Sequence, residues 1–254
     1  MIPAGPPPAS TLGTGNWIIS GYYQSGASIL PYSFGGSLVN DGGQVSGVFH
    51  VSSSCFGNGA TDVPYTGTLD SKNTLYLMSS PVDGQVLTLL GTLSADGSSI
   101  SDGIFKVTGG CSGSIVGGTI ADGPGASFET VAYRVPSLTG SWTSSSWSPV
   151  AGGDEFPLSE QLTQAAAADA HGDYVLTGTA TVTGSNCFTQ GTLEDGSFVS
   201  GGIGREIIRM NDGSTVEAAV TLDDGGANTR PRLLLNPGSV SGGNCNGPIE
   251  VGLW

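Results

Sequence analysis

Apolar and polar residues alternate with a period of two along much of the chain. This alternation is typical of β-strands that bury one face, because successive side chains of a strand point to opposite sides. Turn sequences such as Asn40-Asp-Gly-Gly43 separate the alternating segments and favour hairpins. The positions expected to face the core are Val45, Gly47, Phe49 and Val51, then Leu87, Leu89, Gly91 and Leu93, then Tyr174, Leu176, Gly178, Ala180 and Val182, then Val216, Ala218, Val220 and Leu222.

One stretch departs from this pattern. Residues 160–170 include four consecutive alanines, Ala165–Ala168. Alanine has the highest helix propensity, so this stretch predicts either a short helix or an elaborated loop.

A longer pattern occurs twice. Cys55-Phe56 is followed 56 positions later by Cys111, and Cys187-Phe188 is followed 58 positions later by Cys245. Matching cysteines in two repeats predict one disulfide in each, Cys55–Cys111 and Cys187–Cys245. Zinc is the alternative, but its ligands normally include closely spaced cysteine pairs, which the sequence lacks. Disulfides indicate an oxidising compartment.

The repeats also share an opening, because Gly15-Asn-Trp17 returns as Gly140-Ser-Trp142. We therefore divide the chain into a Pro/Gly-rich tail (1–14), a first β-domain (15–136) and a second β-domain (137–254). Strands at regular spacing predict an all-β fold of two tandem antiparallel barrels or sandwiches, each with one intradomain disulfide.

The second repeat has a shorter end. About 24 residues follow Cys111 before the boundary, whereas nine follow Cys245, so a counterpart of 128–135 is missing. An exposed sheet edge can accept a strand from another molecule. One hypothesis is that the extended tail of a neighbouring copy supplies it. The alternative is that the second domain has fewer strands or pairs with the first.

Charge narrows the choice of partners. Seven basic residues against 21 acidic ones give a net charge of −14, which excludes nucleic acid and anionic membrane surfaces as favoured partners. No apolar run approaches the length of a transmembrane helix. The first ten residues lack the features of a signal peptide, so we expect any such peptide to have been removed; a lipid anchor upstream is possible.

The opening Gly-x-Trp followed by a meander of hairpins resembles the lipocalin and avidin-type β-barrels. That resemblance implies that Trp17 and Trp142 pack at a barrel end, with Arg134 against Trp17; the second repeat has no such arginine. Over nearly the whole chain the pattern is also similar to uncharacterised exported lipoprotein-like tandem β-repeat proteins of soil bacteria. The residues that carry this second resemblance are Gly15-Asn-Trp17, Cys55-Phe56, Thr66-Gly-Thr-Leu69, Gly109-Gly-Cys111, Gly140-Ser-Trp142 and Cys187-Phe188. It implies export and a surface location, and no activity.

Candidate chemistry is sparse. Motifs for a nucleophile elbow, a phosphate-binding loop or a zinc protease do not occur in the sequence. His50 is expected on a strand face and His171 in a turn, and a hydrolase using one of them is the least favoured reading. Asp154-Glu155 and Asp223-Asp224 lack the spacing of a calcium loop and are interpreted as solvated turns. A ligand-stacking surface is one hypothesis for Trp17, Tyr22, Tyr23, Trp142 and Trp147, and core or barrel-end packing is the commoner role.

We therefore expect no catalytic residues, no cofactor and no metal. The favoured function is a structural or adhesive protein at the cell exterior that self-associates, or binds other surface proteins, through strand exchange. The alternative is a barrel that binds a small apolar or sugar ligand, with inward glycines such as Gly47, Gly91 and Gly178 leaving space for it.

Overall fold

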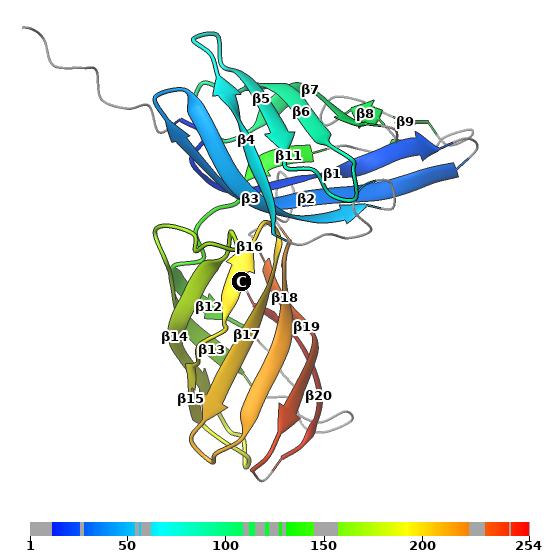
Figure 1. Ribbon diagram of the computed structural model, residues 1–254. Coiled ribbons are helices and arrows are strands. Elements are labelled where there is room, and N and C mark those ends of the chain that lie inside the picture. Colours follow the sequence, from blue (N-terminus) through cyan, green and yellow to red (C-terminus); the bar gives the residue numbers. More distant parts are fainter. Residues whose placement is uncertain are drawn as a thin grey trace, which may run out of the picture. The chain divides into compact units, whose positions relative to one another are not determined.

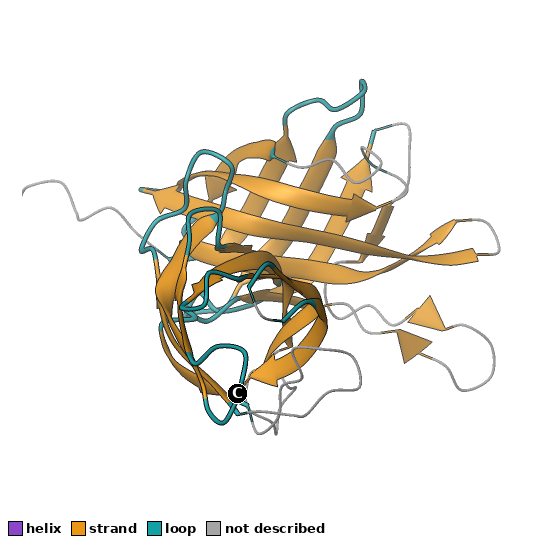
Figure 2. Cartoon of the chain, turned by 90° about the horizontal axis from the view of Figure 1, so that it is seen from below, coloured by secondary structure: helices purple, strands orange, loops and turns teal. Residues whose placement is uncertain are grey.

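A computed structural model describes residues 12–25, 28–53, 56, 62–108, 112–114, 120–121, 127–128, 131–144, 157–223, 232–243 and 245–253. Every regular element in these residues is a β-strand, and all strand pairs are antiparallel (Figure 2). The predicted all-β antiparallel fold class is confirmed. No helix capable of crossing a membrane occurs in the described part of the chain.

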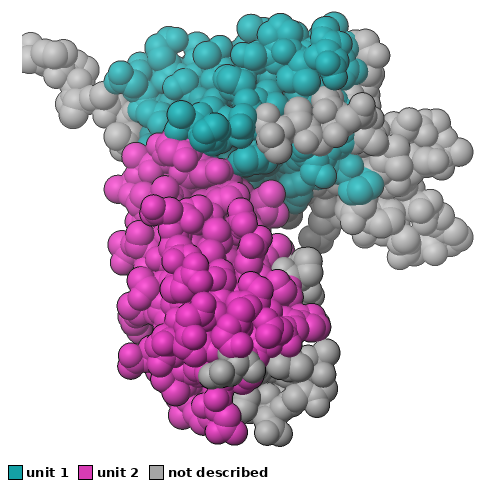
Figure 3. All heavy atoms as spheres, turned by 60° about the horizontal axis from the view of Figure 1, so that its bottom comes forward, with its two compact units in different colours: residues 1–135, 170–172 teal, residues 136–169, 173–254 magenta. Residues whose placement is uncertain are grey.

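The chain divides into two compact units, and the division falls between Val135 and Pro136 (Figure 3). Unit 1 comprises residues 1–135 and 170–172; unit 2 comprises 136–169 and 173–254. The two units are described separately.

Unit 1 contains a sheet in the order β11-β1-β2-β3-β4-β5-β6-β7-β8 (Figure 1). Its strands follow the order of the chain except for β11, which joins the sheet beside β1. Their bounds are β1 (Gly15–Ser25), β2 (Ser28–Asp41), β3 (Gln44–Ser53), β4 (Val63–Leu69), β5 (Thr74–Ser79), β6 (Leu87–Leu93), β7 (Ile100–Val107), β8 (Ser112–Ser114) and β11 (Val131–Arg134); β9 (Ile120–Ala121) and β10 (Ser127–Phe128) form a separate pair.

The sheet of unit 1 curls into a nearly closed barrel. β11 pairs with β1 on one side, and Tyr133 forms an antiparallel bridge with Ser99, just before β7, on the other. The Arg134 amide donates to the Ser98 carbonyl at 2.7 Å. Closure of this kind removes exposed sheet edges.

The alternation of the sequence decides what fills this barrel. Val45, Phe49 and Val51 are buried on β3. Four further aromatic rings, those of Trp17, Tyr32, Phe34 and Phe105, are also buried. Tyr32 and Phe105 are 4.5 Å apart between ring centroids, so the interior is packed with rings in mutual contact.

Residues 12–14 also belong to this packing. Leu12 packs against the core, and its carbonyl accepts a hydrogen bond from Asn40 Nδ2 at 2.9 Å. Asn40 Oδ1 also accepts a hydrogen bond from the Gly43 amide at 2.8 Å. This bond stabilises the β2–β3 hairpin that Asn40-Asp-Gly-Gly43 predicts. Residues 12–14, assigned to the tail from the sequence, therefore contact unit 1.

Unit 2 contains a second sheet in the order β12-β13-β14-β15-β17-β18-β19-β20, with β16 pairing β14 and β17. In Figure 2 this sheet curls into a barrel-like ring. The bounds are β12 (Gly140–Thr143), β13 (Leu158–Gln164), β14 (Tyr174–Val182), β15 (Gln190–Leu193), β16 (Phe198–Ser200), β17 (Ile203–Met210), β18 (Thr215–Asp223), β19 (Arg232–Ser241) and β20 (Gly247–Leu253).

β15 and β16 occupy one position in this sheet. Both are antiparallel to β14 and to β17, so together they form a single interrupted strand. β15 carries Gln190-Gly-Thr-Leu193 where β4 of unit 1 carries Thr66-Gly-Thr-Leu69. The sheets then correspond strand by strand from β1 and β12 to β8 and β20.

One position of unit 1 has no counterpart in unit 2. In unit 1, β11 pairs with the outer edge of β1. Among the described residues, β12 pairs with β13 alone, and β12 and β20 form the two ends of the sheet. The described strands therefore include no counterpart of β11 beside β12.

Of the two alternatives for residues 160–170, the short helix is wrong, and a loop is observed from residue 165 onward. Leu158–Gln164 forms β13, and residues 165–173 form the loop that leads to β14. Leu158 and Leu162 are buried while Ser159 and Gln161 are exposed. Residues 158–164 pair with β14, and the four alanines lie in the loop that follows. Their helix propensity therefore does not determine the local structure.

Candidate functional site

The two repeated tryptophans have the same local geometry. Trp17 donates its Nε1–H to the Gly13 carbonyl at 2.7 Å, and Trp142 donates to the Leu138 carbonyl at 2.8 Å. The glycine of each Gly-x-Trp motif has a positive φ, +148° at Gly15 and +147° at Gly140. The motif therefore needs glycine for its backbone, and it places both indoles at the start of the first strand.

The surroundings of the two tryptophans differ. Trp17 is fully buried and lies opposite Arg134 of β11. The aliphatic part of Arg134 covers Gly15, because a Cβ atom built on Gly15 would lie 2.8 Å from Arg134 Cδ. In unit 2, Trp142 is partly exposed, and a Cβ atom built on Gly140 would have no described atom within 4 Å. The predicted approach of Arg134 to Trp17 thus has no equivalent among the described residues of unit 2.

The structure describes one of the two predicted disulfides. Cys187 and Cys245 form a disulfide that links residues 58 positions apart in the sequence. The predicted pair Cys55–Cys111 lies outside the described residues. A covalent link therefore joins the β14–β15 connection of unit 2 to the turn between β19 and β20.

The other candidate residues are scattered. His50 lies on β3 and is partly exposed. His171 is exposed, and its Nδ1 lies 3.0 Å from Asp62 Oδ2 within unit 1. Asp223 ends β18. The described residues do not include Trp147, Asp154, Glu155 and Asp224. Among the residues that the structure describes, no group of three or more His, Cys, Asp or Glu side chains could hold a metal ion.

A pair of buried glutamates in unit 2 was not predicted. Glu160 on β13 is 0% exposed and Glu206 on β17 is 1% exposed. None of their four carboxylate oxygens has a hydrogen-bond partner among the described residues. Burying an unpaired polar group costs free energy of about 1–3 kcal/mol, and an unpaired charge costs more. This pair is therefore the strongest electrostatic anomaly in the described chain.

Burial determines how these carboxyls titrate. Loss of solvent raises the pKa of Glu206 to about 8. Loss of solvent, and then the nearby Glu206 charge, raise the pKa of Glu160 well above its ordinary value. At neutral pH the carboxyl of Glu206 is therefore held largely in its protonated form.

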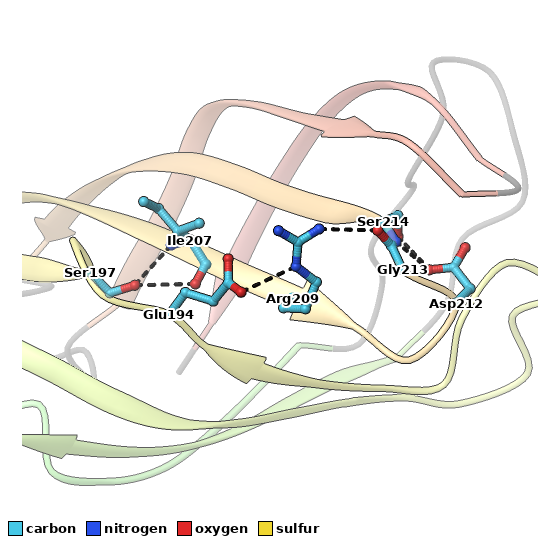
Figure 4. Close-up of polar contacts among 7 residues, drawn as sticks. All are labelled: Glu194, Ser197, Ile207, Arg209, Asp212, Gly213 and Ser214. Carbon is cyan, nitrogen blue, oxygen red and sulfur yellow. Dashed lines mark hydrogen bonds and ion pairs between the residues drawn. The ribbon is translucent and has the colours of Figure 1, made fainter.

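The opposite face of β17 shows ordinary pairing (Figure 4). Arg209 donates from Nε to Glu194 Oε1 at 3.1 Å and from its guanidinium to the Gly213 carbonyl, also at 3.1 Å. Arg205 pairs with Glu217 at 2.7 Å. The basic residues of β17 thus point outward and contact outward acids, whereas Glu206 of the same strand points inward without one.

Alternation alone could have located both glutamates. Glu160 lies between the apolar Leu158 and Leu162 at spacings of two, and Glu206 lies two residues before Ile208 and four before Met210. Glutamate is rarely buried, so a glutamate at an inward-facing position was not expected to be part of the core.

The glycines expected to open the interior for a ligand do not do so. A Cβ atom on Gly47 or Gly178 would collide with a backbone oxygen of the adjacent strand, and one on Gly91 would collide with Ile100. These glycines allow strands to approach closely and do not leave the expected space. A void of about 10 Å³ among the apolar residues of unit 2, beside Ala180, holds about one water molecule.

Comparisons with known proteins identify no family: no family model matches the chain, and neither the curated proteins nor the solved structures contain a match. The described residues define a class by their architecture, an antiparallel all-β protein with a barrel-like sheet in each unit and a disulfide in the second.

Proposed function

We propose that this chain is a non-catalytic structural or adhesive protein of the cell exterior, which joins other molecules by strand addition at the outer edge of β12. The observation that carries the proposal is the difference between the two sheets. β1 is paired on both sides, by β2 and β11, whereas the described part of unit 2 pairs β12 on one side only.

The edge strand of a sheet can accept another extended segment, whose backbone N–H and C=O groups pair with its own. β12 also carries Trp142, whose partial exposure leaves apolar surface beside that edge. Strand addition would bury the indole as β11 helps to bury Trp17.

Two properties support an exterior location. The Cys187–Cys245 disulfide suits an oxidising compartment, where such bonds persist. The charge of −14 with few lysines keeps a glycine-rich β-protein soluble at the surface. The resemblance to exported lipoprotein-like repeat proteins agrees with this location.

The test is the mass of the native protein in solution and on cells. Thr143→Lys adds a charge on the exposed face of β12, a device that natural proteins use to block edge pairing. We expect the wild-type chain to form higher-mass species that this variant reduces. The control is Thr179→Lys on β14, an exposed threonine on a strand that is paired on both sides.

Deletion of residues 1–11 tests whether the tail is the donor strand; residues 12–14 must stay because they pack in unit 1. Collapse to monomers would identify the tail as the donor. Species of unchanged mass in the wild type and Thr143→Lys would refute strand addition at β12.

A further inference from the structure

The outer face of unit 2 has a shallow hollow over four neighbouring strands, β16, β17, β18 and β19 (Figure 1). Its volume is about 560 Å³, which falls within the range of about 300–1,000 Å³ that is usual for ligand sites. We propose that this hollow binds a neutral sugar unit of a glycan. The site is separate from β12, so the inference goes beyond strand addition and does not depend on it.

The strand register places the lining side chains in two rows on one face of the sheet. Phe198 lies opposite Arg205, and Arg205 lies opposite Ala219. In the neighbouring row, Glu217 lies opposite Ser239. Directly opposed residues of antiparallel strands point to the same side of the sheet. An aromatic ring, an acid, a base and a hydroxyl group therefore share one small area, and all five residues line the hollow.

The hollow coincides with a local irregularity of the sheet. Ala219 contributes only a methyl group to the row that begins with Phe198 and Arg205. The register of β18 and β19 shifts between Ala218 and Val220, so the irregularity lies at Ala219 itself. Bulges interrupt the regular surface of a sheet and are frequent beside active sites. A short side chain at such a position leaves space between the longer ones.

The polar groups of the hollow form a neutral set. Arg205 Nη2 donates to Glu217 Oε1 at 2.7 Å, and both side chains are about half exposed. A surface ion pair of this kind adds little to stability. The contact uses one of the five N–H groups of Arg205. Neither Glu217 Oε2 nor Ser239 Oγ has a hydrogen-bond partner among the residues that the structure describes. The pair therefore holds further donors and an acceptor at fixed places.

Apolar surface surrounds the ring of Phe198. Val175 of β14 lies opposite Phe198 and is 41% exposed. Ile203 precedes Arg205 by two positions on β17, so it points to the same outer face, and it is 54% exposed. Single exposed apolar residues need no explanation, whereas a group of them beside polar residues indicates an interaction surface.

These groups fit the chemistry of a sugar ring. A pyranose presents C–H groups on its faces, which pack on an aromatic ring such as that of Phe198. Its hydroxyl groups both donate and accept hydrogen bonds, and the Arg205–Glu217 pair offers both functions. A charged ligand would be repelled by one member of this pair, which favours a neutral one.

A second hollow provides a comparison within the same unit. It lies over β14, β15 and β17, has a volume of about 380 Å³, and is lined by Arg209 together with threonines and amides. Its described lining residues include no aromatic ring, so it offers hydrogen bonds without a stacking surface.

The experiment titrates the full chain at pH 7 with neutral oligosaccharides, namely the hexamers of β-1,4-linked glucose and of β-1,4-linked N-acetylglucosamine, and follows methyl signals by NMR. We expect the signals of Val175 and Ile203 to shift with at least one of these probes. Those of Leu90 and Ile104, which are exposed on unit 1, should stay unchanged. Polygalacturonate, a polyanion, should produce no such shifts.

Variants locate the binding groups. Phe198→Ala should weaken binding about 10-fold, because it removes the stacking surface, and Arg205→Gln should also weaken it. Both side chains lie on the outer face, so circular dichroism should show an unchanged fold. The matched control is Arg209→Gln, which removes another outward ion pair of β17 and should leave the affinity unchanged.

Absence of shifts with both neutral probes would overturn the inference and leave strand addition at β12 standing. Loss of binding in Arg209→Gln, with binding retained in Arg205→Gln and Phe198→Ala, would assign the sugar to the second hollow and also overturn it. Shifts that are larger with polygalacturonate than with the neutral probes would overturn the assignment to a neutral ligand.

Discussion

The buried glutamates of unit 2 make its stability depend on pH in an unusual direction. Burial raises the pKa of Glu206 to about 8, from an ordinary value of 4.5. Below pH 4.5 the carboxyl is protonated in both the folded and unfolded chain, so it costs nothing extra. As the pH rises from 4.5 toward 8, the unfolded chain releases the proton while the folded chain keeps it. The free energy of unfolding therefore falls with rising pH over this window.

The size of the effect follows from linkage. Each group that is protonated when folded and ionised when unfolded lowers the free energy of unfolding by about 1.4 kcal/mol per pH unit. Between pH 5 and pH 7 Glu206 alone gives a loss of about 3 kcal/mol, and Glu160, whose pKa is raised by the same burial, adds to it. This is a large share of the 5–15 kcal/mol that is typical of a domain.

Urea unfolding of the wild type and of Glu206→Gln at pH 5, 6, 7 and 8 measures this loss. Glutamine has nearly the same shape and no charge, so the variant should match the wild type at pH 5 and exceed it by about 3 kcal/mol at pH 7. Glu217→Gln, on an exposed face, controls for loss of a surface carboxylate. A wild type whose stability stays level or rises between pH 5 and pH 7, relative to Glu206→Gln, would refute the reasoning.

Two further predictions concern the disulfide and the two tryptophans. Replacing Cys187 and Cys245 by serine should destabilise unit 2 by up to about 4 kcal/mol, because the bond closes a loop of 58 positions. Calorimetry under oxidising conditions measures this loss, and a value below about 1 kcal/mol would contradict the prediction. Trp17→Ala should lower the free energy of unfolding by about 3–5 kcal/mol, because the ring is fully buried and donates a hydrogen bond to Gly13. Trp142→Ala should lower it clearly less, because Trp142 is partly exposed. Equal losses in chemical unfolding would contradict this difference.

The fold class was predictable because its signal is local. The alternation at 87–93, 174–182 and 215–222 gave the buried face of β6, β14 and β18, and the side chains buried there are those expected from the period. The hairpin at Asn40–Gly43 was predictable for the same reason, since it depends on residues that are neighbours in sequence.

The candidate site was not predictable to the same extent because it depends on partners far apart in sequence. Glu160 and Glu206 share one interior only because β13 and β17 enter one sheet; the local alternation indicates that each faces inward, but not that both face the same interior. The split of one strand into β15 and β16 also requires the register of both neighbours. The placement of Arg134 opposite Trp17, by contrast, was suggested by resemblance and not by spacing.

The two units depart from a common plan at the first strand of each sheet. In unit 1, β11 pairs with β1, Trp17 is buried, and Trp17 lies opposite Gly36. In unit 2, β12 pairs with β13 alone among the described strands, and Trp142 lies opposite Glu160. The buried Glu160 carboxyl has no hydrogen-bond partner among the described residues, and such burial costs stability where Gly36 costs none. The difference at this strand therefore supports the proposed strand addition at β12, which would cover the partly exposed Trp142.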